Sequence, residues 1–368
     1  MKRVLPLILL AGLFLGFSAP AAVQAVDELQ VLDTSVQVDF PMKVNFGLSA
    51  AGAADITDIR LHYTIERMSH AGVISEVPLK FGPATHVDAE WVWDMRKTGG
   101  LPPGSSVSYW WTVRDAAGGE VETEPATVRV DDTRYPWRSL SEGLLTLYWY
   151  EGEEAFAREL MDTAQQALVR LTGDTGAELE SPADIYIYAK SEDLLGAMIF
   201  PQEWTGGVAY TRFSTIAIGI SPGNLGWGKR AMTHELTHLV IHQVVFNPYN
   251  NLPTWLDEGL AMSTEGPLEP VFVNMLVNAI NEDGLITVRS LSSPFSAYAE
   301  ESLLAYAQSY SLVDFLINNY GQSRMLELLN TFRQGSGYDE ALQKVYGFDM
   351  DGLNELWSGY ITSKALAN

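Results

Sequence analysis

Short runs of alternating apolar and polar residues recur over the first third of the chain. Residues 35–40, 59–65 and 107–113 alternate in this way, and glycines and prolines separate the runs. Because successive side chains of a β-strand point to opposite faces, the alternation predicts strands that are buried on one face only. Roughly 100 residues of such strands, with turn residues between them, predict an antiparallel β-sandwich.

The spacing of apolar residues then changes. Residues 153–171 carry apolar side chains three and four positions apart, which predicts an amphipathic helix. Apolar runs at residues 185–188, 206–210 and 215–220 predict short strands, the last two as a hairpin. Helical spacing dominates the rest of the chain, so the second part is predicted to be α+β and mainly helical.

We therefore predict a multidomain chain in which an all-β sandwich precedes an α+β, mainly helical domain. The sandwich is expected at residues 26–133, and its length and strand pattern are similar to immunoglobulin and fibronectin type III modules. Residues 134–142 are expected to be a linker, and residues 143–368 the second domain.

The first 25 residues have the composition of a signal peptide. Lys2 and Arg3 precede an apolar run at residues 4–17, and small residues lead to Ala25. This order is typical of export signals, and the run is short for a membrane span, which needs about 20 residues. We expect cleavage after Ala25 and an extracytoplasmic protein with no membrane contact; an uncleaved N-terminal anchor is the alternative.

Composition narrows the chemistry. The chain has 46 acidic and 23 basic residues, a formal net charge of −23, so nucleic acid is not expected as a partner. Hydrophobic residues make up 47% of the chain, which is enough for folded cores. Cysteine is absent, which excludes disulfides, thiolate nucleophiles and cysteine-ligated metals. Any metal site must therefore use histidine and carboxylate ligands. The sequence does not indicate an oligomeric state.

One motif in the second part carries catalytic chemistry. Residues 234–238 read His-Glu-Leu-Thr-His, within a segment whose apolar positions fit a helix. Residues four apart on a helix share a face, so His234 and His238 can bind one ion with Glu235 beside them. Zinc accepts histidine nitrogen well and needs a third protein ligand if a position is to stay open for water.

The third ligand is expected from the next helix. Residues 247–253 contain prolines and asparagines that end the first helix, and Thr254 is a suitable N-cap for a second one. A helix that folds back after this short turn can bring Glu258 opposite the two histidines. The small residues Gly259 and Ala261 allow close approach between helices.

These two segments resemble the gluzincin zinc metallopeptidases, and most closely their peptidase MA-like branch. The string Trp-Leu-x-Glu-Gly-x-Ala at residues 255–261 is similar to the third-ligand segment of the related aminopeptidase N-like enzymes. The resemblance covers roughly residues 140–365. It implies one Zn²⁺ per chain held by His234, His238 and Glu258, with Glu235 as the general base for a zinc-activated water.

The resemblance also implies an oxyanion-stabilising tyrosine at the start of a downstream helix. Tyr306 is the first candidate for this catalytic role, and Tyr310, one turn further along, is the alternative. A peptide substrate is expected to pair with the edge of a strand that includes Gly207, Val208 and Ala209. A hairpin strand without a role in substrate binding is the alternative.

Two departures from the family pattern change details of the expected site. Thermolysin-like enzymes carry an aspartate four residues after the third ligand, where this chain has Met262, so Asp257 or Glu265 is expected to orient a histidine. His242 is expected to pack or to support the site, because a fourth ligand would close it. Residues 206–210 lack the acid with which aminopeptidase N-like enzymes capture a free amine, which favours an endopeptidase over an aminopeptidase.

Two functions from different classes are compatible with these residues. The first is an exported zinc peptidase that acts on peptide or protein substrates. The second is an extracytoplasmic binding or adhesion protein whose peptidase-like domain is a non-catalytic scaffold. Because His234, His238, Glu235 and Glu258 are all present, the sequence favours the peptidase.

Overall fold

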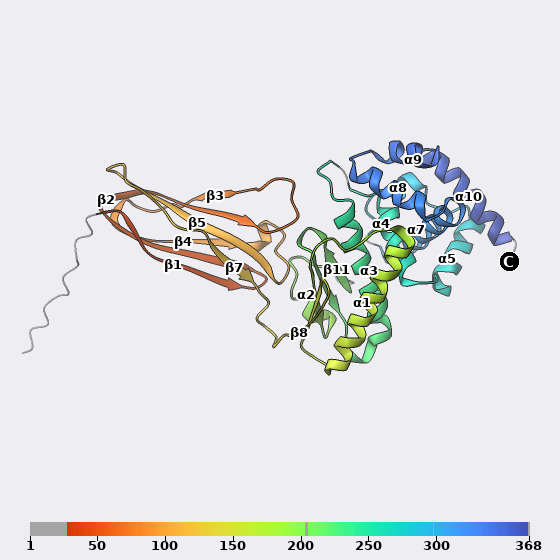
Figure 1. Ribbon diagram of the computed structural model, residues 1–368, viewed down its shortest axis with the longest axis horizontal. Helices are drawn as coiled ribbons and strands as arrows, with labels where there is room; N and C mark the ends of the chain where they lie inside the picture. Colours follow the sequence, from red (N-terminus) through yellow and green to blue (C-terminus); the bar gives the residue numbers. More distant parts are fainter. Residues whose placement is uncertain (1–27, 203–204, 250, 297, 367–368) are drawn as a thin grey trace, which may run out of the picture.

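The computed structural model describes residues 28–202, 205–249, 251–296 and 298–366 (Figure 1). The predicted signal peptide at residues 1–25 lies outside these ranges. Among the helices within them, none combines the length and the apolar character that a bilayer span requires.

The N-terminal part is all β, as predicted, and its strands form a seven-stranded antiparallel sheet. The strands are β1 (Gln30–Asp39), β2 (Lys43–Ile65), β3 (Ser75–Pro78), β4 (Ala84–Asp94), β5 (Ser105–Asp115), β6 (Glu120–Glu122) and β7 (Ala126–Val130). The first half of the long strand β2 pairs with β1 and β4, and its second half pairs with β3 and β5.

An irregular stretch of β2 around Ile56 separates its two halves. The bend lets the halves face each other across a core, where the ring of Phe46 lies 5.1 Å from that of Tyr109 on β5. Trp111 and Ile59 are fully buried in the same core. The immunoglobulin or fibronectin type III assignment of this region stays a prediction.

A second sheet of five strands, in the order β11-β12-β10-β9-β8, begins the C-terminal part. Its strands are β8 (Arg138–Glu142), β9 (Leu145–Trp149), β10 (Ala183–Tyr188), β11 (Gly207–Tyr210) and β12 (Thr215–Gly219). The three central strands are parallel, and β8 and β11 are antiparallel edges. β8 lies within residues 134–142, where we expected a linker. The five residues of β8 include one apolar residue, Leu140, and show no strand pattern in the sequence. They form a strand because they pair with β9.

Helices make up most of the remaining C-terminal part (Figure 1). The longer ones are α1 (Glu154–Thr175), α3 (Leu225–Val244), α4 (Thr254–Glu265), α5 (Pro270–Asn281), α7 (Ala299–Tyr320), α8 (Gln322–Arg333), α9 (Tyr338–Tyr346) and α10 (Met350–Leu366); short ones are α2 (Ser191–Leu195) and α6 (Val288–Leu291). Buried residues of α1, α3, α4 and α7 share one core with the second sheet, so these helices hold fixed positions relative to each other.

Two helix boundaries differ from the expectation. Thr254 is the first residue of α4 and Pro253 is the N-cap, while the Thr254 hydroxyl donates to the Ser292 carbonyl at 3.4 Å. Helix α7 begins at Ala299, so Tyr306 lies about two turns inside the helix rather than at its start. Helix ends depend on contacts with neighbouring elements, which periodicity does not reveal.

Candidate metal centre and cleft

Helix α3 carries the two histidines on the flank of a buried stripe. Met232, Leu236 and Leu239 are fully or almost fully buried in the helical core, which fixes the rotation of the helix. His234 and His238 consequently face away from this core, with 17% and 12% of their side chains exposed. Their Nε2 atoms lie 3.1 Å apart, so both imidazoles point to one place, as the motif predicts.

Helix α4 brings Glu258 to the same place. Its Oε2 atom lies 3.3 Å from Nε2 of His234 and 3.4 Å from Nε2 of His238. Gly259 makes this position attainable: a Cβ there would meet the Ser309 carbonyl of α7 and lie 2.6 Å from Cγ2 of Val313. The predicted close approach of helices at Gly259 is present, and it is an approach to α7.

The three side chains fit a metal ion. One donor atom from each of His234, His238 and Glu258 lies within 4.8 Å of the others. Oε2 of Glu258 is buried yet has no hydrogen-bond partner, and a buried carboxylate oxygen without a partner is costly unless an ion binds it. Two imidazoles and one carboxylate are the ligand set of catalytic zinc sites that keep a position open.

Two carboxylates orient the imidazoles by contacting their Nδ1 atoms, which face away from the three ligand atoms. Oε1 of Glu265 lies 2.7 Å from Nδ1 of His234, and Oδ1 of Asp257 lies 2.9 Å from Nδ1 of His238. We expected one of these two acids in this role, and the structure uses both, one for each histidine. Such partners fix which ring nitrogen faces the metal.

Two further residues complete this outer layer. His242 is not near the three ligand atoms; its Nε2 lies 2.8 Å from Oδ2 of Asp257, which agrees with the expected supporting role. Arg230 donates to Oε2 of Glu265 at 3.0 Å. Sequence reasoning missed Arg230, although its position one turn before His234 on the same helix could have indicated it.

Charges in this cluster shift the pKa values of its members. Burial opposes a charged imidazolium, but the adjacent carboxylates of Glu258 and Glu265 raise the pKa of His234 to about 9. Burial alone would raise the pKa of Glu258, but the neighbouring histidines lower it to about 2. Because protons and a metal ion compete for the same ring nitrogens, metal binding here releases protons.

Glu235 points to the other side of α3, toward strand β11. It is buried, and burial raises its pKa above the usual range of a glutamate. The backbone N–H of Ala209 donates a hydrogen bond to the Glu235 carboxylate. A Cβ at Gly207 would lie 2.8 Å from Oε1 of Glu235, so a side chain at this point would shift the carboxylate.

A cleft of about 890 Å³ opens beside the cluster. Its lining includes His234, Glu235, Gly207, Val208 and Tyr306, whereas Tyr310 and Ala209 are not among its described lining residues. The Tyr306 ring centre lies 6.4 Å from that of His234. Burial, with Glu258 and Glu235 adding to it, raises the pKa of Tyr306, so its hydroxyl keeps its proton.

The cleft also has an apolar wall that the sequence did not reveal. Phe200, Trp227 and Phe272 line it, and Phe200 and Trp227 expose 77% and 42% of their surface. These residues come from a loop, the first turn of α3 and α5, so no local pattern joins them in the sequence.

Comparison with known proteins agrees with this geometry. Residues 163–363, more than half of the chain, match the family described as the Peptidase MA superfamily. The chain belongs to this superfamily. No protein in a search of curated sequences matches it.

Several solved structures are similar at low identity. The M1 zinc metallopeptidase from Deinococcus radiodurans is 12% identical, with 91% of this chain and 94% of that one covered and a TM-score of 0.41. OgpA from Akkermansia muciniphila is 10% identical with a TM-score of 0.22; the match covers 29% of this chain and spans 28% of that one. The family match therefore carries the assignment.

Proposed function

We propose that the protein is an exported zinc-dependent peptidase that hydrolyses peptide bonds. The observation that carries the proposal is the convergence of His234, His238 and Glu258, with an otherwise unpartnered carboxylate oxygen, beside a cleft that contains Glu235. Family membership supports the same conclusion.

Each residue of the cleft has a role that follows from its position. His234, His238 and Glu258 would hold a zinc ion, which would act as a Lewis acid and lower the pKa of a bound water to about 7. Glu235 takes a proton from the attacking water and passes it to the leaving amine; its raised pKa suits both steps. Tyr306, which stays protonated, donates a hydrogen bond to the developing oxyanion.

Strand β11 provides an edge for an extended substrate. It is the terminal strand of its sheet. Just before it, the Gly206 carbonyl accepts a hydrogen bond from the backbone N–H of Gly219, the last residue of β12, at 2.9 Å. In an antiparallel ladder this turns the N–H and C=O groups of Gly207 and the C=O group of Ala209 away from β12, while the Ala209 N–H bonds to Glu235. Because the cleft lies on that side, a peptide can add there as a further strand.

The carboxylates of the cleft favour internal cleavage over removal of an N-terminal residue. Glu265 pairs with His234 and Arg230, and Glu269 pairs with Arg230, so among the described lining residues these acids are already engaged. The remaining acid, Glu235, is needed as the base. With no acid left to bind a free amine, we propose an endopeptidase.

The decisive experiment combines metal analysis with cleavage of a peptide library. We expect wild-type protein to hold about one zinc per chain and to lose cleavage when a chelator removes it. Glu235→Gln should keep the zinc and lose cleavage by about a thousandfold or more, because the base is gone while the ligands remain. Glu258→Ala should lose the zinc itself.

The control separates the two functions that the sequence left open. Glu269→Gln, at the rim of the cleft, should retain both zinc and cleavage. Wild-type protein that holds zinc but cleaves no member of the library would contradict the peptidase and favour the binding-protein alternative.

Export and the two-domain boundaries are parts of the same proposal. A signal peptide at residues 1–25 would leave a mature chain that starts at Val26, with the sandwich at residues 26–133 presenting substrate or spacing the active site. Mass spectrometry of protein recovered from the extracytoplasmic fraction tests this, since an uncleaved anchor would retain the first 25 residues.

A further inference from the structure

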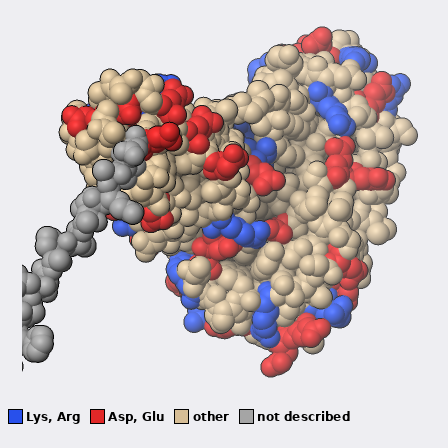
Figure 2. Space-filling view, turned by 60° about the vertical axis from the view of Figure 1, so that its left-hand side comes forward, with Lys and Arg blue, Asp and Glu red and all other residues tan. Residues whose placement is uncertain are grey.

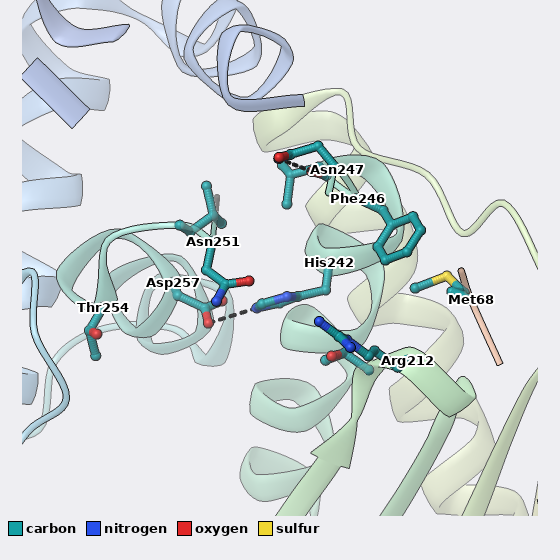
Figure 3. A pocket seen from close by; sticks show the side chains of 11 residues that line it. Met68, Arg212, His242, Phe246, Asn247, Asn251, Thr254 and Asp257 are labelled. Carbon is teal, nitrogen blue, oxygen red and sulfur yellow. Dashed lines mark hydrogen bonds and ion pairs between the residues drawn. The ribbon is translucent and has the colours of Figure 1, made fainter. Parts of the chain in front are cut away.

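A second cavity lies where the N-terminal part meets the helical part. Its volume is about 390 Å³, and its walls come from the end of α3, the start of α4, the turn that holds Arg212, and Met68 of the β2–β3 loop (Figure 3). An adjoining hollow of about 380 Å³ shares Met68 and Arg212 and adds Arg67 and His70. We call the two together the junction cavity; none of its residues lines the catalytic cleft.

Two contacts hold the β2–β3 loop against the C-terminal part, one to the turn that holds Arg212 and one to Phe246, just after α3. The Met68 amide donates to the Arg212 carbonyl at 2.7 Å. The His70 ring stacks on Phe246 with centres 4.4 Å apart and planes 6° from parallel. The loop therefore forms a defined side of the junction cavity, and the cavity exists only when both parts of the chain are present.

The junction cavity is lined by two arginines that no carboxylate of its described lining pairs with. Arg67 and Arg212 are exposed to it, and within the described part of the chain neither forms an ion pair. Arginines elsewhere, such as Arg129, Arg134 and Arg230, pair with carboxylates. The protein has twice as many acidic as basic residues, and acidic side chains lie on both lobes in Figure 2. The described lining of the junction cavity reverses this ratio, with two arginines and one carboxylate.

The single carboxylate among the described lining residues does not neutralise them. Asp257 uses Oδ1 for His238 at 2.9 Å and Oδ2 for His242 at 2.8 Å. Figure 3 shows the side chains of Arg212, Asn251 and Asp257 gathered around His242, so a ligand beside Arg212 would also meet an amide. The remaining polar lining is neutral, as with Asn247 and Thr254.

We propose that the junction cavity binds a carboxylate group, either an acidic side chain of a peptide or a small free dicarboxylate. A guanidinium matches the two oxygens of a carboxylate and binds them with charge-assisted hydrogen bonds. The charge of Asp257 in the wall favours a monoanionic carboxylate over a dianionic phosphate. The proposal goes beyond the peptidase function and does not depend on it, because binding is measured without turnover.

Fluorescence anisotropy with a labelled tetraglutamate peptide tests the site. The full-length, zinc-loaded Glu235→Gln protein serves as the parent, so that the probe is not cleaved. We expect tetraglutamate to bind and tetraglutamine to bind at least tenfold more weakly. Arg212→Ala and Arg67→Ala, each made in the parent, should weaken tetraglutamate binding about tenfold, which is typical for loss of one charge-assisted hydrogen bond.

Arg170→Ala is the matched control, because Arg170 is exposed on α1 and has no ion pair within the described residues. It should bind the probe as the parent does. Equal binding of tetraglutamate and tetraglutamine, or an Arg212→Ala affinity within twofold of Arg170→Ala, would overturn the proposal.

Competition distinguishes the sources of the carboxylate. Displacement of the probe by glutarate supports a free dicarboxylate, and displacement only by unlabelled acidic peptide supports a side chain. If inorganic phosphate displaces the probe as well as glutarate does, the site is a general anion site and the carboxylate assignment is wrong.

Discussion

At the scale of single residues, the candidate metal centre depends on histidines whose Nδ1 atoms are hydrogen-bonded to carboxylates, which leaves Nε2 for an ion. Each imidazole ring directs Nε2 to the candidate metal position because its Nδ1 meets a carboxylate, Glu265 for His234 and Asp257 for His238. Glu258 has no such partner for Oε2. Burial and hydrogen bonding therefore select which atoms remain available to bind an ion.

Asp257 should contribute to zinc affinity without touching the metal. We expect Asp257→Asn to weaken zinc binding about 10- to 100-fold, because the amide cannot support His238 as the carboxylate does. Competition with a chelator of known affinity measures this directly. Glu269→Gln is the control, since Glu269 pairs with Arg230 and, among the described residues, contacts none of the candidate ligands. An equal loss of zinc in both variants would contradict a specific role for Asp257.

The two candidate tyrosines can be told apart by their kinetics. Tyr306 lines the cleft and Tyr310 is not among its described lining residues. We expect Tyr306→Phe to lower kcat about 100-fold with little change in KM, because the hydroxyl acts on the transition state. Tyr310→Phe should leave both constants nearly unchanged; the reverse result would transfer the oxyanion role to Tyr310.

At the scale of helices and strands, the cleft is assembled from elements that pack closely at small residues. Glycines occupy two such points: Gly259, where α4 meets α7, and Gly207, where β11 meets Glu235 of α3. β11 is also the terminal strand of its sheet among the described strands, and this edge is where we propose that a peptide pairs. The distances between α3, α4, α7 and β11 thus decide whether the candidate zinc ligands and Glu235 lie at one cleft.

Gly259→Ala tests the contact between α4 and α7. The added methyl group would overlap the Ser309 carbonyl and Val313, so we expect a loss of about 1–3 kcal/mol in the free energy of unfolding, as for other overpacked sites. Because Glu258 is the preceding residue, zinc affinity should fall as well.

Gly226→Ala is a suitable control for the Gly259 variant. Gly226 is also helical, but a Cβ there has no neighbour within 4 Å. Thermal unfolding of both variants gives the comparison. Because alanine has a higher helix propensity than glycine, Gly226→Ala should not be destabilised. An equal loss in both variants would contradict the contact between α4 and α7 as its cause.

At the scale of the whole molecule, the N-terminal β part lies beside the second sheet (Figure 1), and aromatic and ionic side chains join the two. Tyr186 and Tyr188 of β10 belong to the same buried cluster as the sandwich core. The fully buried carboxylate of Asp132 accepts from Arg134 at 2.7 Å and from the Tyr188 hydroxyl at 2.9 Å. These contacts explain why the two parts can form a shared junction cavity.

Asp132→Ala should therefore destabilise the junction. Removing the carboxylate leaves Arg134 and Tyr188 without their buried partner, and we expect a loss of about 3 kcal/mol in the free energy of unfolding. Chemical denaturation of the full chain measures it. Asp131→Ala, which breaks an exposed pair with Arg129, should cost less than about 1 kcal/mol; similar losses in both variants would contradict the buried interface.

The sequence by itself determined the features that depend on neighbours along the chain. The four-residue spacing of His234 and His238 places them on one helix face whatever surrounds the helix. Glu258, which follows a short turn, lies beside both histidines as the sequence predicted. Alternating residues likewise predicted strand β5, and helical spacing predicted α1. Periodicity is local, so it survives without knowledge of the fold.

Only the tertiary structure decided what depends on residues far apart in the chain. It made β8 a strand by pairing it with β9, assigned Asp257 and Glu265 to separate histidines, and placed Arg67 beside Arg212. The position of Tyr306 in the cleft likewise follows from how α7 packs, not from where the helix begins. Such contacts are set by packing between elements, and no spacing along the sequence encodes them.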